Sequence, residues 1–205
     1  MMHQNANSRR RLTRSDRQGF SLIEMLITVL VFAILAAAVL PLFGTHIPTQ
    51  LTSVAQIVAA DLDDARALAI ANGSNYRLTV DVTNNQYWLA HVGSNTLLNV
   101  LPPSSFKLSS DTSNRRTTAL NELPISTPKV RLVGAEATAG SGSAVTNIEF
   151  NSLGGTIIPQ DTVFWLACGS GTAGRYISVQ VSAITGLAEI GDVQAVVPAL
   201  AAAGS

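Results

Sequence analysis

The stretch "RQGFSLIEMLITVLVFAILAAAVLPLF" (residues 17–43) joins a basic leader directly to a long hydrophobic segment. From Met25 to Leu40 it contains no charged residue, and its one acid, Glu24, stands four residues after Phe20. A carboxylate inside an apolar membrane segment is energetically costly and points by default to a functional site. Any interpretation of this segment therefore has to explain Glu24.

Several structures are compatible with the apolar run. As a helix, residues 20–43 would be about 36 Å long at ~1.5 Å per residue, enough to span a bilayer. A buried core helix of this length would be unusually apolar. A secretory signal would be shorter and followed by a small-residue cleavage site, which "AAAVLP" (residues 36–41) resembles. A plain membrane anchor accounts for the hydrophobicity but not for Glu24.

The charge distribution predicts the orientation of such an anchor. Residues 1–19 carry five arginines and one acid, whereas the rest of the 205-residue chain has 8 basic and 12 acidic residues. Because cytoplasmic flanks are enriched in Lys and Arg, the leader is expected in the cytoplasm and the C-terminal part outside it. The leader arginines are Arg9, Arg10, Arg11, Arg14 and Arg17.

The sequence "GFSLIE" followed by an apolar run resembles the N-terminus of the type IV pilin and pseudopilin family. The resemblance implies that a prepilin peptidase cuts between Gly19 and Phe20, keeps the anchor, and leaves Phe20 as an N-methylated N-terminus. Glu24 then becomes the fifth residue of the mature chain, matching the acid of the family. Pro41 matches a proline that the family commonly carries in this helix.

This resemblance gives Glu24 a physical role. Cleavage creates an ammonium group at Phe20, one helical turn from the carboxylate, and in a filament the amine of a neighbouring subunit can be the partner. A charge pair in a low dielectric depends strongly on position, so it can set the axial register of packed helices. The alternative is an acid favoured by the helix dipole, by ~0.3–1 kcal/mol against an insertion penalty of roughly 2.5–3.5 kcal/mol that shrinks near the interface.

Past Pro48 the pattern becomes amphipathic, with apolar residues at spacings of three and four that predict a helix face docked on a sheet. We expect Asn72-Gly73 to stop this helix, which could run 53 residues from Phe20 with a kink at Pro41 or Pro48. The predicted apolar stripe is Leu51, Val54, Val58, Leu62, Ala65 and Ala69. The charges off the stripe, expected as a solvated face, are Asp61, Asp63, Asp64 and Arg66.

From residue 74 the hydrophobic period changes to two. "NYRLTVDV", "TNN" and "QYWLAHV" (residues 75–92) predict a β-hairpin. Further strands are predicted at residues 129–133, 147–150, 162–168, 176–182 and 187–190, separated by turn-rich spacers. The polar residues 102–128, which include Arg115-Arg116, are expected as a surface excursion, and residues 134–144 as a loop.

Together these elements predict an α+β fold, in which a long N-terminal helix with a membrane-spanning first half packs on a C-terminal antiparallel β-sheet domain, as in pilins. The expected divisions are a leader at 1–19 removed on maturation, a transmembrane helix half at 20–43, an amphipathic half at 44–73, an extracytoplasmic β domain at 74–193 with a loop insertion at about 102–144, and a flexible tail at 194–205.

Three other features carry no predicted chemistry. "GSGTAG" (residues 169–174) fits G-x-G-x-x-G, but a strand pattern follows where a dinucleotide site needs a helix, so a hairpin turn is expected. The only cysteine, Cys168, cannot form an intrachain disulfide and is expected as a small buried side chain. His3, His46 and His91 lack ligand-like spacing, so neither a metal nor a cofactor is predicted.

The C-terminal half extends the resemblance to the GspH/FimT-type minor pseudopilins. The matching stretches are "IEFNSLGGTI" (148–157), "VFWLACGSG" (163–171), "RYISVQVSAITGLAEI" (175–190, with Ile177, Val179, Thr185 and Gly186) and "DLDDARALAIANG" (61–73). Residues 102–144 fit this pattern poorly and look like a specific insertion.

The resemblance implies a minor pseudopilin, a structural subunit of a type II secretion pseudopilus involved in protein export. It would lie in the bacterial inner membrane as a single-pass protein, with its N-terminus cytoplasmic and its C-terminal domain periplasmic, and join the pseudopilus on assembly. The implied partners are other pseudopilins or pilins, contacted through the N-terminal helix, and the prepilin peptidase. Retention of Glu24 argues against the tip subunit type, which lacks this acid.

Two other function classes are weighed against it. A minor pilin of a type IV pilus would serve assembly, adhesion or DNA uptake, but after residue 131 only Arg175 is basic, and phosphate binding needs several cations, so no nucleic acid is expected. An anchored enzyme lacks support, because the chain has no G-x-S-x-G, H-E-x-x-H or P-loop motif; no catalytic residue is assigned.

Overall fold

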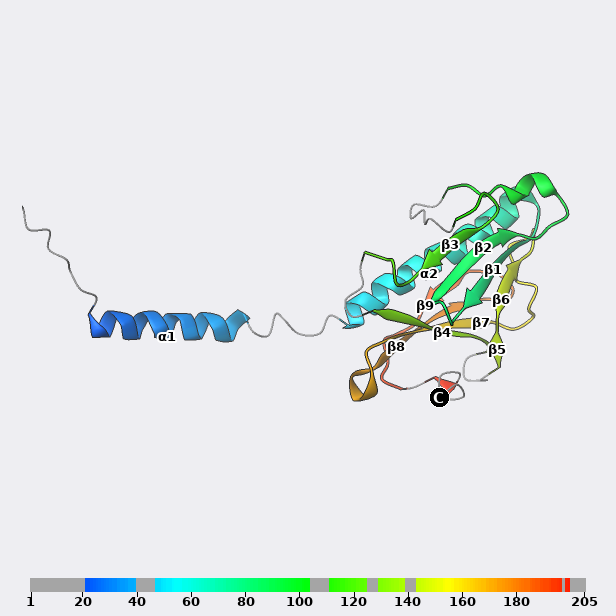
Figure 1. The fold of residues 1–205 in the computed structure, drawn as a ribbon. Coiled ribbons are helices and arrows are strands. Elements are labelled where there is room, and N and C mark those ends of the chain that lie inside the picture. The colour runs from blue at the N-terminus through cyan, green and yellow to red at the C-terminus, as the bar shows by residue number, and fades with distance from the viewer. Residues whose placement is uncertain are drawn as a thin grey trace, which may run out of the picture. The chain divides into compact units, whose positions relative to one another are not determined.

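The computed structural model describes residues 21–39, 47–103, 111–124, 129–138, 143–196 and 198–199 (Figure 1). The chain divides into two compact units, Met1–Thr45 and His46–Ser205. The first contains helix α1 (Leu22–Val39), and the second contains helix α2 (Ile47–Asn72) and nine strands among its described residues.

Helix α1 begins at the predicted apolar run, where the Ser21 carbonyl accepts hydrogen bonds from the amides of Glu24 (3.0 Å) and Met25 (3.2 Å). The predicted membrane segment, residues 20–43, is described only over 21–39, so Phe20 and Pro41 lie outside the described residues. Within the described part of the chain, no helix combines the length and the hydropathy that a membrane crossing requires.

Helix α2 has the predicted amphipathic pattern. Pro48 is its second residue, in the first turn, where the missing N–H removes no intrahelical hydrogen bond. The helix ends in a Schellman motif: Gly73 (φ +56°) donates its amide to Ile70, and Ser74 donates to Ala69. The predicted stop at Asn72-Gly73 is therefore confirmed, whereas continuity across residues 40–46 lies outside the described residues.

A four-stranded antiparallel sheet has the order β3-β2-β1-β6. The predicted hairpin is confirmed, because Tyr76 pairs with His91 and Asp81 with Gln86. The strands are β1 (Tyr76–Asp81), β2 (Gln86–His91), β3 (Arg116–Ala119) and β6 (Asn147–Phe150). A short 3₁₀ helix, η2 (Thr96–Asn99), follows β2.

A five-stranded antiparallel sheet has the order β5-β4-β7-β8-β9. Its members are β4 (Val130–Ala137), β5 (Ala144–Val145), β7 (Thr162–Cys168), β8 (Arg175–Val181) and β9 (Ala188–Ile190). The glycine-rich residues 169–174 connect the antiparallel strands β7 and β8 through a short 3₁₀ turn, η3 (Gly171–Ala173), as the hairpin prediction required.

The core lies between α2 and the two sheets (Figure 1). All six residues of the predicted stripe are buried, and α2 contacts strands of both sheets. Cys168 is buried in this core, and its burial raises the pKa of the thiol. A helix packed on antiparallel sheets confirms the predicted α+β fold class.

The loop prediction for residues 102–144 is wrong for its described strands. It contains β3, the second half of β4 and the first residue of β5, whereas the first half of β4 confirms the strand predicted at 129–133. The side chain of Arg116, expected in solvent, is buried. In β4 the pairing register with β7 shifts between Leu132 and Gly134, which breaks the alternation that a strand pattern requires. The expected tail, residues 194–205, is described only at 194–196 and 198–199.

Two glycine turns meet in direct backbone contact. Gly154 lies in the connection after β6, and Gly186 in the β8–β9 turn, both with positive φ (+87° and +66°). A Cβ on Gly186 would lie 2.0 Å from the Gly154 carbonyl oxygen, so no side chain fits there. This contact explains why the β8–β9 turn requires glycine at 186, whereas at 154 glycine is favoured by the positive φ and by the closeness of the Ile70 side chain.

The second unit, His46–Ser205, contains both sheets and is called the sheet unit below. We predict that Gly186→Ala lowers its free energy of unfolding more than Gly171→Ala does. Gly171 also has positive φ (+57°), but nothing lies within 4 Å of a Cβ built there, so it reports the backbone cost alone. That cost is about 1–2 kcal/mol, and the clash at Gly186 adds roughly 1–3 kcal/mol. Urea unfolding followed by tryptophan fluorescence measures both, and equal losses would contradict the close approach.

Candidate functional site

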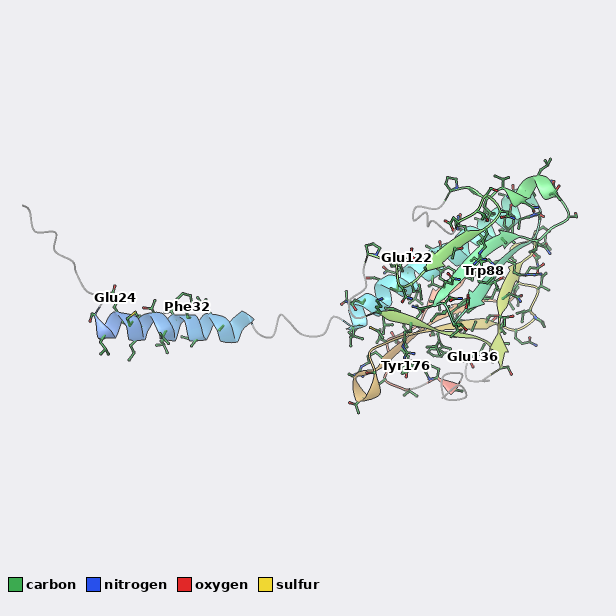
Figure 2. All side chains as sticks on the ribbon, in the orientation of Figure 1. Glu24, Phe32, Trp88, Glu122, Glu136 and Tyr176 are labelled. Carbon is green, nitrogen blue, oxygen red and sulfur yellow. The ribbon has the colours of Figure 1, made fainter. Side chains whose placement is uncertain are left out.

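Helix α1 is a long apolar surface without cover in its own unit. All side chains from residue 21 to 36 are exposed, and the large hydrophobic ones are between 48% and 82% exposed (Figure 2). These are Leu22, Ile23, Met25, Leu26, Ile27, Val29, Leu30, Val31, Phe32, Ile34 and Leu35. Apolar residues occupy every side of the helix, so α1 has no solvent-adapted face.

Glu24 is the only ionisable residue in the described part of α1 and lies in its first turn. The one hydroxyl in the helix, that of Thr28, donates a hydrogen bond to the Glu24 backbone carbonyl. Thr28 therefore satisfies its polar group inside the helix, which leaves the Glu24 carboxylate as the polar side-chain group to be accommodated. The predicted cleavage residues, Gly19 and Phe20, lie outside the described residues, so the amine–carboxylate pair stays a prediction.

Charged side chains fasten α2 to the first sheet. Arg116 on β3 donates from Nη2 to Asp64 at 2.5 Å, and the same nitrogen lies 3.9 Å from Asp61. Asp61 also accepts hydrogen bonds from the hydroxyls of Tyr87 (2.7 Å) and Thr118 (2.9 Å). The predicted solvated face is therefore wrong at Asp61, whereas the Asp64 side chain is 46% exposed and pairs with Arg116 from a partly solvated position.

The Tyr87 hydroxyl is the buried centre of this network. Burial, followed by the nearby Asp61 carboxylate, holds the pKa of Tyr87 well above its usual range. The phenol therefore stays protonated and donates a hydrogen bond to Asp61. This hydrogen bond satisfies a carboxylate at the edge of the core. The network is a structural joint between helix and sheet.

Arg66 fastens α2 to the two glycine turns. Its Nε donates to the carbonyl of Thr185 at 2.6 Å and to that of Gly154 at 3.3 Å. Asp63, in contrast, is exposed as expected. One cation on α2 thus holds together two turns that are 31 residues apart in the sequence.

The other polar candidates serve local packing. His91 lies 2.7 Å from the Ser74 hydroxyl and 2.8 Å from the Asn99 side-chain oxygen, and the Arg115 guanidinium stacks 4.0 Å over the Trp88 ring. The described residues contain no cluster of three His, Cys, Asp or Glu side chains that could hold a metal.

The leader and α1 share a sequence motif with known proteins. Residues 14–40 match the prokaryotic N-terminal methylation motif. The match spans the end of the leader, the predicted cleavage site and all of α1. Among curated proteins, none matches the sequence significantly.

The similar solved structures include a type IV minor pilin and a minor pseudopilin. The minor pilin FimU of Pseudomonas aeruginosa is 15% identical, with a TM-score of 0.45, over 73% of this chain and 92% of FimU. The minor pseudopilin EpsH of the Vibrio cholerae Type 2 Secretion System is 12% identical, with a TM-score of 0.46, over 70% of this chain and 97% of EpsH.

The sequence did not predict the ion pair between Arg116 and Asp64 that joins α2 to the first sheet. Arg116 stood in a polar stretch, and its partner Asp64 lies 52 residues earlier, so no local pattern linked them. The acids at residues 61–64 were the only sequence feature that could have indicated a basic partner. The partner could be identified only once the sheet order had placed β3.

We predict that Arg116→Met costs about 1.5–3 kcal/mol of unfolding free energy, as expected for a buried charged hydrogen bond. The matched control is Arg77→Met, because Arg77 pairs with Glu149 at 2.7 Å but is 41% exposed. In this pair Glu149 is 15% exposed but the Arg77 guanidinium is solvated, so the loss is expected to be smaller than for the buried Arg116, at about 0.2–1 kcal/mol. Urea unfolding compares the two, and a loss no larger than that of the control would show that Arg116 is not a joint.

Proposed function

We propose that this chain is a membrane-anchored structural subunit of a pilin-type filament. The observation that carries the proposal is α1: an uncovered helix, apolar on all sides, with one acid in its first turn, inside a match to the N-terminal methylation motif. No function within a soluble monomer uses such a surface, because it would associate non-specifically.

The energetics support two successive environments for α1. Burying a large apolar side chain contributes about 1.5–3 kcal/mol, so eleven of them strongly favour a bilayer or a packed helix bundle over water. A bilayer covers α1 before assembly, and the helices of neighbouring subunits cover it afterwards. Cleavage before Phe20 keeps α1 in the mature protein, as this sequence of events requires.

In this proposal Glu24 sets the register. Inside a helix bundle, a carboxylate is most stable where an ammonium group lies within a few ångströms. The N-terminal amine of Phe20, or that of the next subunit, supplies that group, and a shift of one helical turn would separate the pair. The apolar contacts of α1 contain no such directional element, so Glu24 provides the axial specificity.

Within this class we propose a minor pseudopilin of a type II secretion pseudopilus, on the C-terminal resemblance described above. The role is structural and not enzymatic. The leader arginines favour a single-pass orientation in the inner membrane, with residues 46–205 in the periplasm. A minor pilin of a type IV pilus is the second candidate, since the similar solved structures include both kinds of subunit.

We predict that Glu24→Ala leaves the chain in the membrane but lowers its recovery in sheared filaments by roughly tenfold or more, equivalent to about 1.4 kcal/mol in the assembly equilibrium. The carboxylate is lost while the apolar surface is kept. Co-expression with its filament subunits, fractionation and immunoblotting measure both quantities.

Two controls make this result specific. Glu24→Gln keeps the size but not the charge and should fail like Glu24→Ala, whereas Glu122→Ala, at an exposed acid of the sheet unit, should assemble normally. Normal recovery of Glu24→Ala in filaments would remove the register role.

A further inference from the structure

Five apolar side chains gather around the two glycine turns, and we call them the glycine-turn patch. Leu153 and Ile184, at the tips of the turns, are 90% and 89% exposed, and the other three are about half exposed. The patch consists of Ile70, Leu153, Ile157, Ile184 and Leu187. Two fully exposed aliphatic side chains on adjoining turns are unfavourable in water and need an explanation.

Backbone contacts make the patch continuous. The Thr156 amide donates to the Ala183 carbonyl at 2.9 Å, and a Cβ on Gly155 would lie 2.8 Å from the Ile184 carbonyl oxygen. The Ile70 side chain closes the patch on the α2 side, because its Cδ1 would be 2.7 Å from a Cβ on Gly154. The five side chains therefore belong to one surface built from three elements.

The patch is also held in a fixed conformation. Arg66 bonds the carbonyls of Thr185 and Gly154, and the turn after β6 is closed by the hydrogen bond from the Asn151 amide to the Gly155 carbonyl. Little conformational entropy is lost when a partner binds side chains presented from such a scaffold. Fixed turns with exposed apolar tips are the arrangement expected of a binding surface.

The chemistry of the patch restricts its partner. Residues 151–158 and 182–187 contain no charged residue, and the nearby Arg66 is already bonded to carbonyl oxygens. A charged partner surface would be desolvated without compensation. The partner surface must therefore be uncharged and apolar.

We propose that the glycine-turn patch docks on the uncharged helical face of a neighbouring subunit that carries the same methylation motif. This rests on the proposed function. Ile70 extends the patch onto the exposed side of α2. Within the matched motif of this chain, residues 25–39 form an uncharged apolar stretch of α1, and its large side chains up to Leu35 are exposed; this is the surface chemistry that the patch requires.

The test uses the full chain co-expressed with its filament subunits. The double variant Leu153→Ser with Ile184→Ser should reduce recovery in filaments roughly tenfold or more, because two central anchors are lost. Leader cleavage and thermal unfolding should stay unchanged, since both side chains are already exposed. The matched control is Leu97→Ser, at a position that is 84% exposed on η2 and should assemble normally.

A photo-crosslinking amino acid at position 153 or 184 identifies the occupant directly. The expected product joins this chain to a subunit whose sequence, determined by mass spectrometry, contains the methylation motif. Crosslinks to lipid or to an exported protein, or normal filament recovery of the double variant, would overturn the proposal. If Glu24→Ala fails to assemble while the double variant succeeds, the filament function stands and only the patch is wrong; if the unaltered chain enters no filament, both fail.

Discussion

One face of α2, from Leu51 to Ala69, is buried against both antiparallel sheets, and the sheet unit depends on this contact. Leu51, Val58 and Leu62 are fully inaccessible, so the helix forms one wall of the core. Polar joints flank the stripe: Arg116 ties the helix to the first sheet, and Arg66 ties it to the turn after β6 and to the β8–β9 turn of the second sheet. The orientation of α2 relative to the sheets is thereby fixed by apolar burial and by directional hydrogen bonds together.

Helix α1 presents the opposite situation within the same chain. Its apolar residues outnumber those of the α2 stripe, yet they are exposed, and the described residues of the first unit offer no surface that covers them. In the sheet unit the hydrophobic effect drives folding. In α1 it favours burial of the helix against something outside its own unit. In the proposed function, folding and assembly are separated along the sequence, and Glu24, the one ionisable residue in the described part of α1, gives the apolar association its register.

The sequence predicts those parts of the fold that depend on local patterns. The α2 stripe, the Asn72-Gly73 stop, the first hairpin and the glycine turn after Cys168 are local, and the structure confirms them. Strand β3 was not predicted, because Arg116 looks like a solvated residue in the sequence and its partner Asp64 is distant along the chain. The second half of β4 escaped because Gly134 interrupts the alternation, and because Glu136 looks like a surface residue although it is buried beside Trp165, whose Nε1 donates to it at 2.7 Å. The candidate site came from the "GFSLIE" resemblance, which spacing and hydrophobicity alone could not supply.

The central claim is that residues 1–19 are removed so that the amine of Phe20 can face Glu24. Intact-mass and N-terminal peptide mass spectrometry of the chain, co-expressed with a prepilin peptidase, tests it most directly. The account predicts a mature protein that begins at Phe20 and carries one added methyl group on its N-terminal amine. A mature chain that begins after Ala38, or one that retains its leader, would contradict it.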